Sequence, residues 1–191
     1  MPVPHFDTRG FLPPFNGNDG ATADRSPYFC TMTELCASLS TTDHRKDLLR
    51  KLIAYRALIA SEDYVAGIQF IDGSFVENIE LTEARNPNDI DVFSILAPPT
   101  KYHADPTAWN SRGLPFWRSE IADNAKNRTR FSIDSYALMM DMGQPVIFLR
   151  NTLYWYSLFS HKKATFAWKG FVAVPLDKTD DQAALLALGG P

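Results

Sequence analysis

The chain has 191 residues, of which 45 % are hydrophobic and 21 % are charged, a composition usual for one globular domain. The formal net charge of −3 excludes an overall basic protein of the kind that coats nucleic acid, although a local basic groove stays possible. No apolar run approaches the roughly 20 residues of a membrane-spanning helix, and the start MPVPHFDTRG has no signal-peptide pattern. We therefore expect no membrane association. Cys30 and Cys36 form no metal motif and no disulfide framework, so we expect reduced thiols in a cytoplasmic protein.

The first part of the chain is rich in Pro, Gly, Asn and Asp. Residues 1–27 therefore predict an extended, turn-rich N-terminal arm. Phe6, Phe11 and Phe15 suggest that this arm lies against the domain formed by residues 28–191.

Two helices are expected next, a short one over residues 29–39 and a long one over residues 41–61. The long segment gathers its apolar residues on one face at helical spacing: Leu48, Leu49, Leu52, Ile53, Tyr55 and Ile59. Thr41 or Thr42 can cap its start. The other side carries basic residues that we expect to be solvated: His44, Arg45, Lys46, Arg50 and Lys51.

The rest of the chain alternates strand and helix signals. Strands are predicted over residues 65–71 and 89–96, joined by a polar loop that ends in the turn signal Asn-Pro-Asn. Residues 97–127 are expected to be irregular, with a short polar stretch that could be helical. The later elements are a strand over 130–138, a helix over 145–160, a strand over 170–176 and a C-terminal helix closed by glycine. Together they predict an α+β fold, with a mixed β-sheet flanked by helices in a single domain.

Two aspartates stand one residue apart at the start of the apolar strand DIDVFSIL. Side chains two apart on a strand point to the same face, so Asp89 and Asp91 should project side by side, followed by Phe93 and Ile95. Two carboxylates so close repel each other, and both stay ionised at neutral pH only where cations compensate. Asp134, within another predicted strand, could supply a third carboxylate. Such a set suits Mg²⁺, which takes a few carboxylates plus substrate phosphates.

A Gly-Ser pair follows the first predicted strand. Gly73 lets the backbone approach a phosphate closely, and free N–H groups with the hydroxyl of Ser74 can hold its oxygens. A helix beginning near Ser74 would add its dipole.

These motifs carry a family resemblance. Gly73-Ser74, then Asp89-Ile90-Asp91, then Asp134 in a later strand resemble the nucleotidyltransferase superfamily related to DNA polymerase beta. The pattern there is a hydrophobic residue, Gly and Gly or Ser, then Asp-x-Asp and a third acidic residue on another strand. The wider chain is also similar to a group of small bacterial nucleotidyltransferase-like proteins of unknown substrate, through FDTRGFLPP, IDGSFVEN, PNDIDVF and WKGFVAVPL.

The resemblance implies a nucleotidyltransferase-like fold and an enzyme that transfers a nucleoside monophosphate from a nucleoside triphosphate to an acceptor. It assigns Gly73 and Ser74 to the phosphates, and Asp89, Asp91 and Asp134 to two Mg²⁺ or Mn²⁺ ions. Asp134 could also help to deprotonate the acceptor hydroxyl. The acceptor itself, a partner protein or RNA, is not named by the sequence. Small members of the superfamily include antitoxins that modify a paired toxin, so a toxin–antitoxin or phage-defence role is implied by analogy.

Each of these assignments has an alternative. Asp89 and Asp91 could be a solvated pair at a strand edge, and Asp141 or Glu120 could be the third acid in place of Asp134. Lys163, with its neighbours His161 and Lys162, could bind the triphosphate, as could Lys169, but such a basic run is more often plain surface.

The aromatic run of the helix over 145–160 also has two interpretations. Tyr154, Trp155 and Tyr156 could stack on a base, although such residues beside leucines more often form core. Finally, no second domain for the acceptor is evident after Asp134, so a catalytically silent binding or regulatory module is the alternative to an enzyme.

Overall fold

A computed structural model describes residues 3–140 and 143–190. Within these residues the protein is a single α+β domain with a five-stranded mixed sheet flanked by helices, which confirms the predicted fold class. The sheet order is β1-β5-β2-β3-β4. The strands are β1 (Tyr28–Phe29), β2 (Gly67–Asp72), β3 (Ile90–Leu96), β4 (Ile133–Met139) and β5 (Val172–Pro175). β2 runs antiparallel to both of its neighbours, whereas β3 and β4 are parallel.

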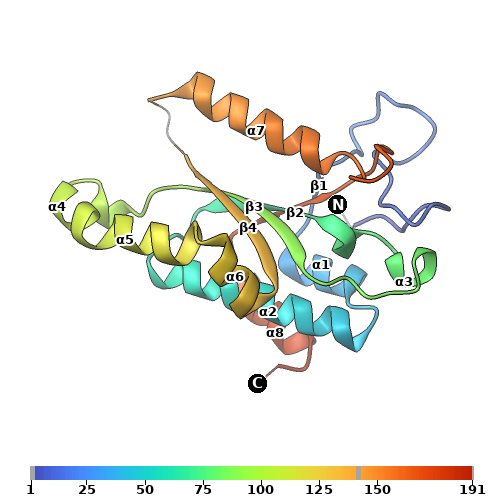
Figure 1. The fold of residues 1–191 in the computed structure, drawn as a ribbon, viewed down its shortest axis with the longest axis horizontal. Coiled ribbons are helices and arrows are strands. Elements are labelled where there is room, and N and C mark those ends of the chain that lie inside the picture. Colours follow the sequence, from blue (N-terminus) through green and yellow to red (C-terminus); the bar gives the residue numbers. More distant parts are fainter. Residues whose placement is uncertain (1–2, 141–142, 191) are drawn as a thin grey trace.

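The helices divide unequally between the two faces of this sheet (Figure 1). Their bounds are α1 (Met32–Leu39), α2 (Asp43–Ser61), α3 (Ile79–Thr82), α4 (Pro106–Ala108), α5 (Leu114–Phe116), α6 (Asn124–Phe131), α7 (Pro145–Phe159) and α8 (Lys178–Ala187). α1, α2, α6 and α8 lie on one face, and α7 crosses the other face alone.

The alternation of side chains along the strands explains this two-faced arrangement. One face of the sheet joins the main core, through Ile71, Ile90, Val92, Ile133 and Val172. The opposite face forms a smaller cluster around Phe93, Ile95, Phe159 and Phe171. Phe93 and Ile95 share a face, as the period of two predicts.

Helix α2 begins and ends close to the predicted bounds. The side chain of Thr42 accepts a hydrogen bond from the backbone N–H of Arg45 and caps the helix, and the six predicted apolar residues are all buried. The expectation of a solvated basic side was wrong for Arg45, which is 1 % exposed. Its guanidinium pairs with Glu80 and donates to the carbonyls of Phe75 and Glu77. His44 is exposed, as expected, although its Nε2 also lies 2.7 Å from the carbonyl of Pro87.

The segment between β3 and β4 is more helical than predicted. Residues 106–121 form successive α and π turns (α4, η3 Trp109–Gly113, α5 and η4 Trp117–Ile121), and α6 follows. The sequence did not predict these turns because Pro106, Gly113 and Pro115 are unfavourable inside a regular α-helix. In the structure the two prolines lie in the first turns of α4 and α5, and Gly113 lies in the π turn η3. Arg130 and Phe131 end α6 and do not begin the strand.

The connection from β2 to β3 is also more ordered than a polar loop. A 3₁₀ turn, η1 (Gly73–Val76), and the single turn α3 bury Phe75, Val76 and Ile79. Arg45 ties this connection to α2 through the carbonyls that it contacts.

The N-terminal segment lies against the domain through backbone and apolar contacts. Phe11 and Leu12 are buried, and the carbonyl of Leu12 accepts a hydrogen bond from the N–H of Gly170. Cys30 and Cys36 are buried free thiols. Among the described residues, no helix combines the length and the apolarity that crossing a bilayer requires.

Replacing Arg45 with Met should destabilise the protein, because Glu80 and two carbonyls lose a buried cationic partner. We expect the free energy of unfolding to fall by roughly 3 kcal/mol in urea denaturation. Lys46→Met is the matched control on the same helix: Lys46 pairs only with an exposed carboxylate, and its loss should cost less than about 0.5 kcal/mol. Similar losses in the two variants would contradict the structural role of Arg45.

Candidate functional site

The strand register places acidic side chains side by side near one end of three adjacent strands, β2, β3 and β4. Asp91 of β3 is opposite Asp72 of β2 and opposite Asp134 of β4. We call these residues the acid row. The next row on the same face, two residues along each strand, is aromatic: Phe70, Phe93 and Tyr136. An acid row beside an aromatic row is the central feature of this face.

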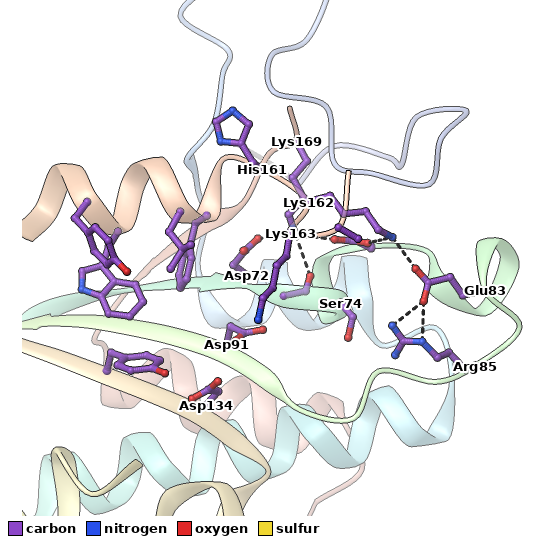
Figure 2. A pocket seen from close by; sticks show the side chains of 18 residues that line it. Asp72, Ser74, Glu83, Arg85, Asp91, Asp134, His161, Lys162, Lys163 and Lys169 are labelled. Carbon is purple, nitrogen blue, oxygen red and sulfur yellow. Dashed lines mark hydrogen bonds and ion pairs between the residues drawn. The ribbon is translucent and has the colours of Figure 1, made fainter. Parts of the chain in front are cut away.

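A cleft of about 660 Å³ opens over the acid row (Figure 2). Five predicted site residues line it: Gly73, Ser74, Asp91, Asp134 and Lys163. Asp89 precedes β3 and does not line the cleft, although its charge still acts on Asp91. The structure therefore brings together most of the predicted residues and leaves Asp89 at the margin.

Asp91 is the most perturbed of these acids. Burial raises its pKa to about 7, and the charges of Asp72, Asp89 and Asp134 act in the same direction, while Lys169 opposes them. The pKa of Asp89 is also raised by burial, against the effect of Arg128. Such mutual repulsion disfavours full ionisation unless a cation enters the site.

Gly73 is required by both its backbone and its surroundings. Its φ of +79° lies in the left-handed region, and a Cβ atom there would stand 1.8 Å from Oδ2 of Asp91. Ser74 follows in the 3₁₀ turn η1, so the helix that we considered near Ser74 is only one short turn. The close approach of Gly73 leaves the carboxylate of Asp91 packed directly against backbone.

Arg128 of α6 joins two of the predicted acids. Its Nη2 contacts Oδ2 of Asp134, and its Nε lies 3.6 Å from Oδ2 of Asp89. Asn124 donates from its amide to the other oxygen of Asp134. The Arg128 guanidinium thus supplies the compensating positive charge for this pair in the structure.

The three predicted metal ligands, Asp89, Asp91 and Asp134, have side chains of the type that binds a divalent cation. Among residues 3–140 and 143–190, no three His, Cys, Asp or Glu side chains are already gathered as a ligand set. The donor chemistry nonetheless fits a hard cation, because Asp91 and Asp134 face one cleft and repulsion from neighbouring acids disfavours ionised Asp91. Asp91 and Asp134, with Asp89 after release from Arg128, could therefore hold Mg²⁺ or Mn²⁺.

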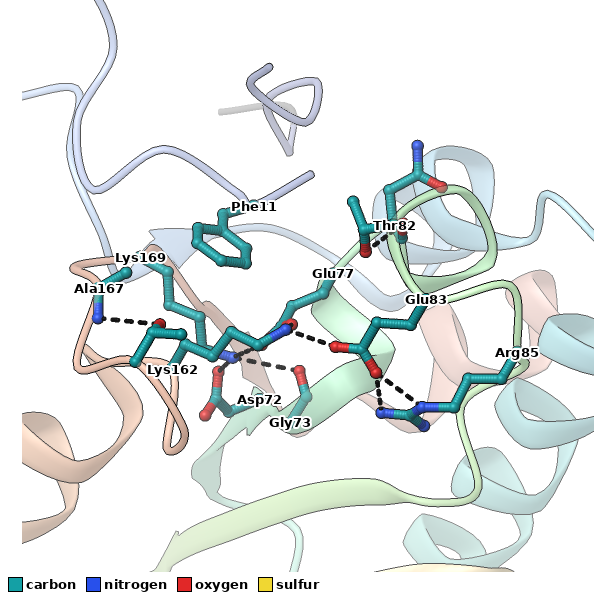
Figure 3. Close-up of polar contacts among 12 residues, drawn as sticks. Phe11, Asp72, Gly73, Glu77, Thr82, Glu83, Arg85, Lys162, Ala167 and Lys169 are labelled. Atoms are coloured by element: carbon teal, nitrogen blue, oxygen red, sulfur yellow. Dashed lines mark hydrogen bonds and ion pairs between the residues drawn. The ribbon is translucent and has the colours of Figure 1, made fainter. Parts of the chain in front are cut away.

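Sequence reasoning missed Asp72 and the role of Lys169. Nζ of Lys169, 2 % exposed, lies 2.9 Å from Asp72 and 2.8 Å from Glu77, and donates to the carbonyl of Gly73 (Figure 3). Burial raises the pKa of Asp72 to about 6 even with Lys169 beside it. Asp72 is the last residue of β2 and directly precedes Gly73, so the sequence shows that it lies next to the Gly-Ser turn. That Asp72 lies opposite Asp91 depends on the register of the two strands, which the sequence does not show.

Lys162 continues the network of ion pairs around Lys169 toward the protein surface. It pairs with Glu77 and Glu83, and Glu83 in turn pairs with Arg85 (Figure 3). Lys169 and Lys162 thus have carboxylate partners in the structure, whereas Lys163 is an exposed residue at the rim of the cleft. Within residues 3–140 and 143–190 Lys163 makes no ion pair, so it can meet a ligand without first leaving a carboxylate.

The aromatic residues of α7 separate into different environments. Trp155 packs on Phe93, with ring centroids 5.0 Å apart, and also lines the cleft. Tyr154 lines the cleft and is 60 % exposed, so the expectation that it belongs to the core was wrong. Tyr156 lies on another side of the helix, against Phe171.

Of the two alternative third acids, only Glu120 has a described position, and that position does not favour it. Glu120 pairs with Lys126 and Arg130, and it does not line the cleft. Asp141 lies outside the described residues.

Comparisons with known proteins return one result. The model of a family described as "Family of unknown function (DUF6932)" matches residues 4–175. No curated protein and no solved structure matches the chain at a significant level.

The raised pKa of Asp91 predicts a pH dependence for the cation-free protein. The folded state holds a proton that the unfolded chain releases, so the free energy of unfolding should fall as pH rises from about 5 to 8. Asp91→Asn should remove roughly 2 kcal/mol of this fall, measured by urea denaturation in EDTA. Asp72 titrates in the same direction, so the difference between wild type and variant is the relevant quantity. Equal pH slopes for the two proteins would rule out a perturbed Asp91.

Arg128 should compete with a divalent cation for the same carboxylates. Arg128→Gln is expected to tighten Mn²⁺ binding, measured by calorimetry, by about three- to tenfold, as suits a partly exposed ion pair. Arg130→Gln is the control, since Arg130 of the same helix pairs with Glu120. Unchanged or weaker binding in Arg128→Gln would mean that Arg128 and the cation do not share ligands.

Proposed function

The chain belongs to a protein family of unknown function, and from its site we propose that it is a metal-dependent nucleotidyltransferase. In this proposal it transfers a nucleoside monophosphate from a nucleoside triphosphate to an acceptor. The observation that carries the proposal is the acid row beside the Gly73–Ser74 turn within one cleft. Asp91 makes no ion pair among the described residues, and burying an unpaired carboxylate is costly, so a purely structural role would not account for it.

The fold supports the same proposal through the order of its parts. The Gly-Ser turn leaves β2, Asp91 lies on β3, and Asp134 lies on the parallel strand β4. This order matches the nucleotidyltransferase pattern to which the sequence motifs are similar. Ser74 and Lys163 also line this cleft and can contact a polyphosphate chain bound there.

Asp91 and Asp134, with Asp89, would hold Mg²⁺ or Mn²⁺. Two bound ions would supply Lewis-acid activation of the acceptor hydroxyl and neutralise charge on the departing pyrophosphate. Asp134 would accept the acceptor proton, held in position by the amide of Asn124. Backbone N–H groups and the hydroxyl of Ser74 would bind phosphate oxygens, with Lys163 adding positive charge at the rim.

A protein is favoured over RNA as the acceptor or partner. The outer face of α7 exposes Val146, Leu149 and Leu153, and Arg150 is the one cation of the helix. RNA binding depends on many cations along the phosphate backbone, which this face lacks. An exposed apolar face suits a protein surface better.

A catalytically silent binding module is the second candidate. The ion pair between Arg128 and Asp134 favours it, because a permanent guanidinium could replace the cation. The two candidates differ in the melting temperature with Mg²⁺ and a nucleoside triphosphate. Nucleotide binding should raise it, and a silent module without a nucleotide site should show no shift.

The activity itself is testable by incubating the protein with Mg²⁺, a cell lysate and each α-³²P-labelled nucleoside triphosphate. We expect label transfer to a macromolecule, and a loss of roughly 10³-fold in rate for Asp91→Asn and for Asp134→Asn, since several kcal/mol of charge stabilisation would be lost.

Asp47→Asn is the control for these variants, because Asp47 is an exposed acid that pairs with Lys51 on α2. It should transfer label at the wild-type rate. Label transfer that persists in Asp91→Asn and Asp134→Asn would remove the acid row from the mechanism.

A further inference from the structure

The aromatic end of the cleft has no role in the chemistry described so far. We propose that Tyr136 and Tyr154, which both contact Trp155, form a stacking site for the nucleobase that prefers purines. This inference rests on the proposed nucleotidyl transfer and concerns the substrate of that same site.

The strand register sets the position of this site relative to the acid row. Tyr136 follows Asp134 by two residues on β4, so the two side chains share a face about 7 Å apart along the strand. Phe93 stands in the same relation to Asp91. A nucleotide whose phosphates meet the acid row therefore has an aromatic surface within the length of one nucleoside.

The rings around this surface are arranged for a further stacking partner. Tyr136 and Trp155 have centroids 4.4 Å apart, and Tyr154 meets Trp155 edge-on at 5.4 Å. Tyr136 and Tyr154 remain 40 % and 60 % exposed. Exposed aromatic faces in a cleft are sites where a base gains stacking energy at little cost in side-chain ordering.

The opposite direction from the acid row is polar. β2 ends at Asp72 and passes into the Gly73–Ser74 turn, and Lys163 lines the same cleft. Aromatic residues thus lie on one side of the carboxylates, and the Gly73–Ser74 turn lies on the other. This polarity orients a nucleoside triphosphate with its base under α7.

The lining of the aromatic end also determines its selectivity. Beyond the acid row, β4 and α7 contribute only aromatic and aliphatic side chains to the cleft: Tyr136, Tyr154, Trp155, Leu158 and Phe159. The polar groups of these side chains are two phenol hydroxyls and the indole N–H of Trp155, so recognition depends mainly on stacking area and little on the edge of the base. Purines should bind better than pyrimidines, and adenine and guanine should bind alike.

Inorganic triphosphate provides the comparison that isolates the base. Calorimetry with Mg²⁺ should show that ATP and GTP bind the wild type roughly tenfold more tightly than inorganic triphosphate, with CTP and UTP between. For Tyr136, whose hydroxyl contacts Asp134, the comparison is between Tyr136→Ala and Tyr136→Phe. Tyr154→Ala should lose the tenfold difference between ATP and inorganic triphosphate without changing the affinity for inorganic triphosphate, and Tyr136→Ala should lose that difference relative to Tyr136→Phe. Tyr136→Phe and Tyr154→Phe should keep it, since they retain the rings.

Tyr156→Ala is the matched control, because Tyr156 is a partly exposed tyrosine of α7 that does not line the cleft. It should bind ATP as the wild type does. Equal affinities of the wild type for ATP and inorganic triphosphate, or a loss in Tyr156→Ala equal to that in Tyr154→Ala, would overturn the stacking site and leave nucleotidyl transfer standing. Binding of neither ATP nor inorganic triphosphate would overturn both.

Discussion

Electrostatic repulsion within the acid row is the constraint on which the rest of the site depends. Neighbouring strands bring Asp72, Asp91 and Asp134 into one line, where burial and mutual charge raise the pKa of Asp91 to about 7. The protein offsets part of this cost on both sides. Lys169 compensates Asp72, and Arg128 compensates Asp134. Asp91, in the middle, makes no ion pair among the described residues, and Lys169 opposes the rise of its pKa only in part, which is why a cation entering the cleft would meet this residue.

The remainder of the fold leaves Asp91 and Asp134 open to the cleft, whereas Asp72 is buried. Most helices cover the opposite face of the sheet, and α7 alone crosses the face that carries the acids (Figure 1). Gly73 brings the backbone against Asp91, and Arg45 secures the connection that follows this turn by binding two of its carbonyls. The site is therefore built on strands and braced by buried ion pairs, an arrangement that holds reacting groups more precisely than loops do.

Local patterns in the sequence predicted the elements and much of the cleft, whereas long-range pairing escaped them. Periodicity and capping located α2, and Gly73, Ser74, Asp91 and Asp134 were identified from motif spacing and do line one cleft. The register that adds Asp72 to the acid row cannot be read from one strand, because it depends on how neighbouring strands align. The burial of Arg45 depends likewise on Glu80, far along the chain, and proline and glycine concealed the helical turns over 106–121.

The central claim is that Asp91 and Asp134 are ligands of a catalytic divalent cation. Its most direct test is a crystal structure of the protein with Mn²⁺ and a non-hydrolysable nucleoside triphosphate, with diffraction recorded at the manganese absorption edge. The account predicts anomalous density within coordination distance of both carboxylates, with Arg128 turned away from Asp134. Manganese density elsewhere, or an Arg128–Asp134 pair that stays closed over a bound nucleotide, would contradict it.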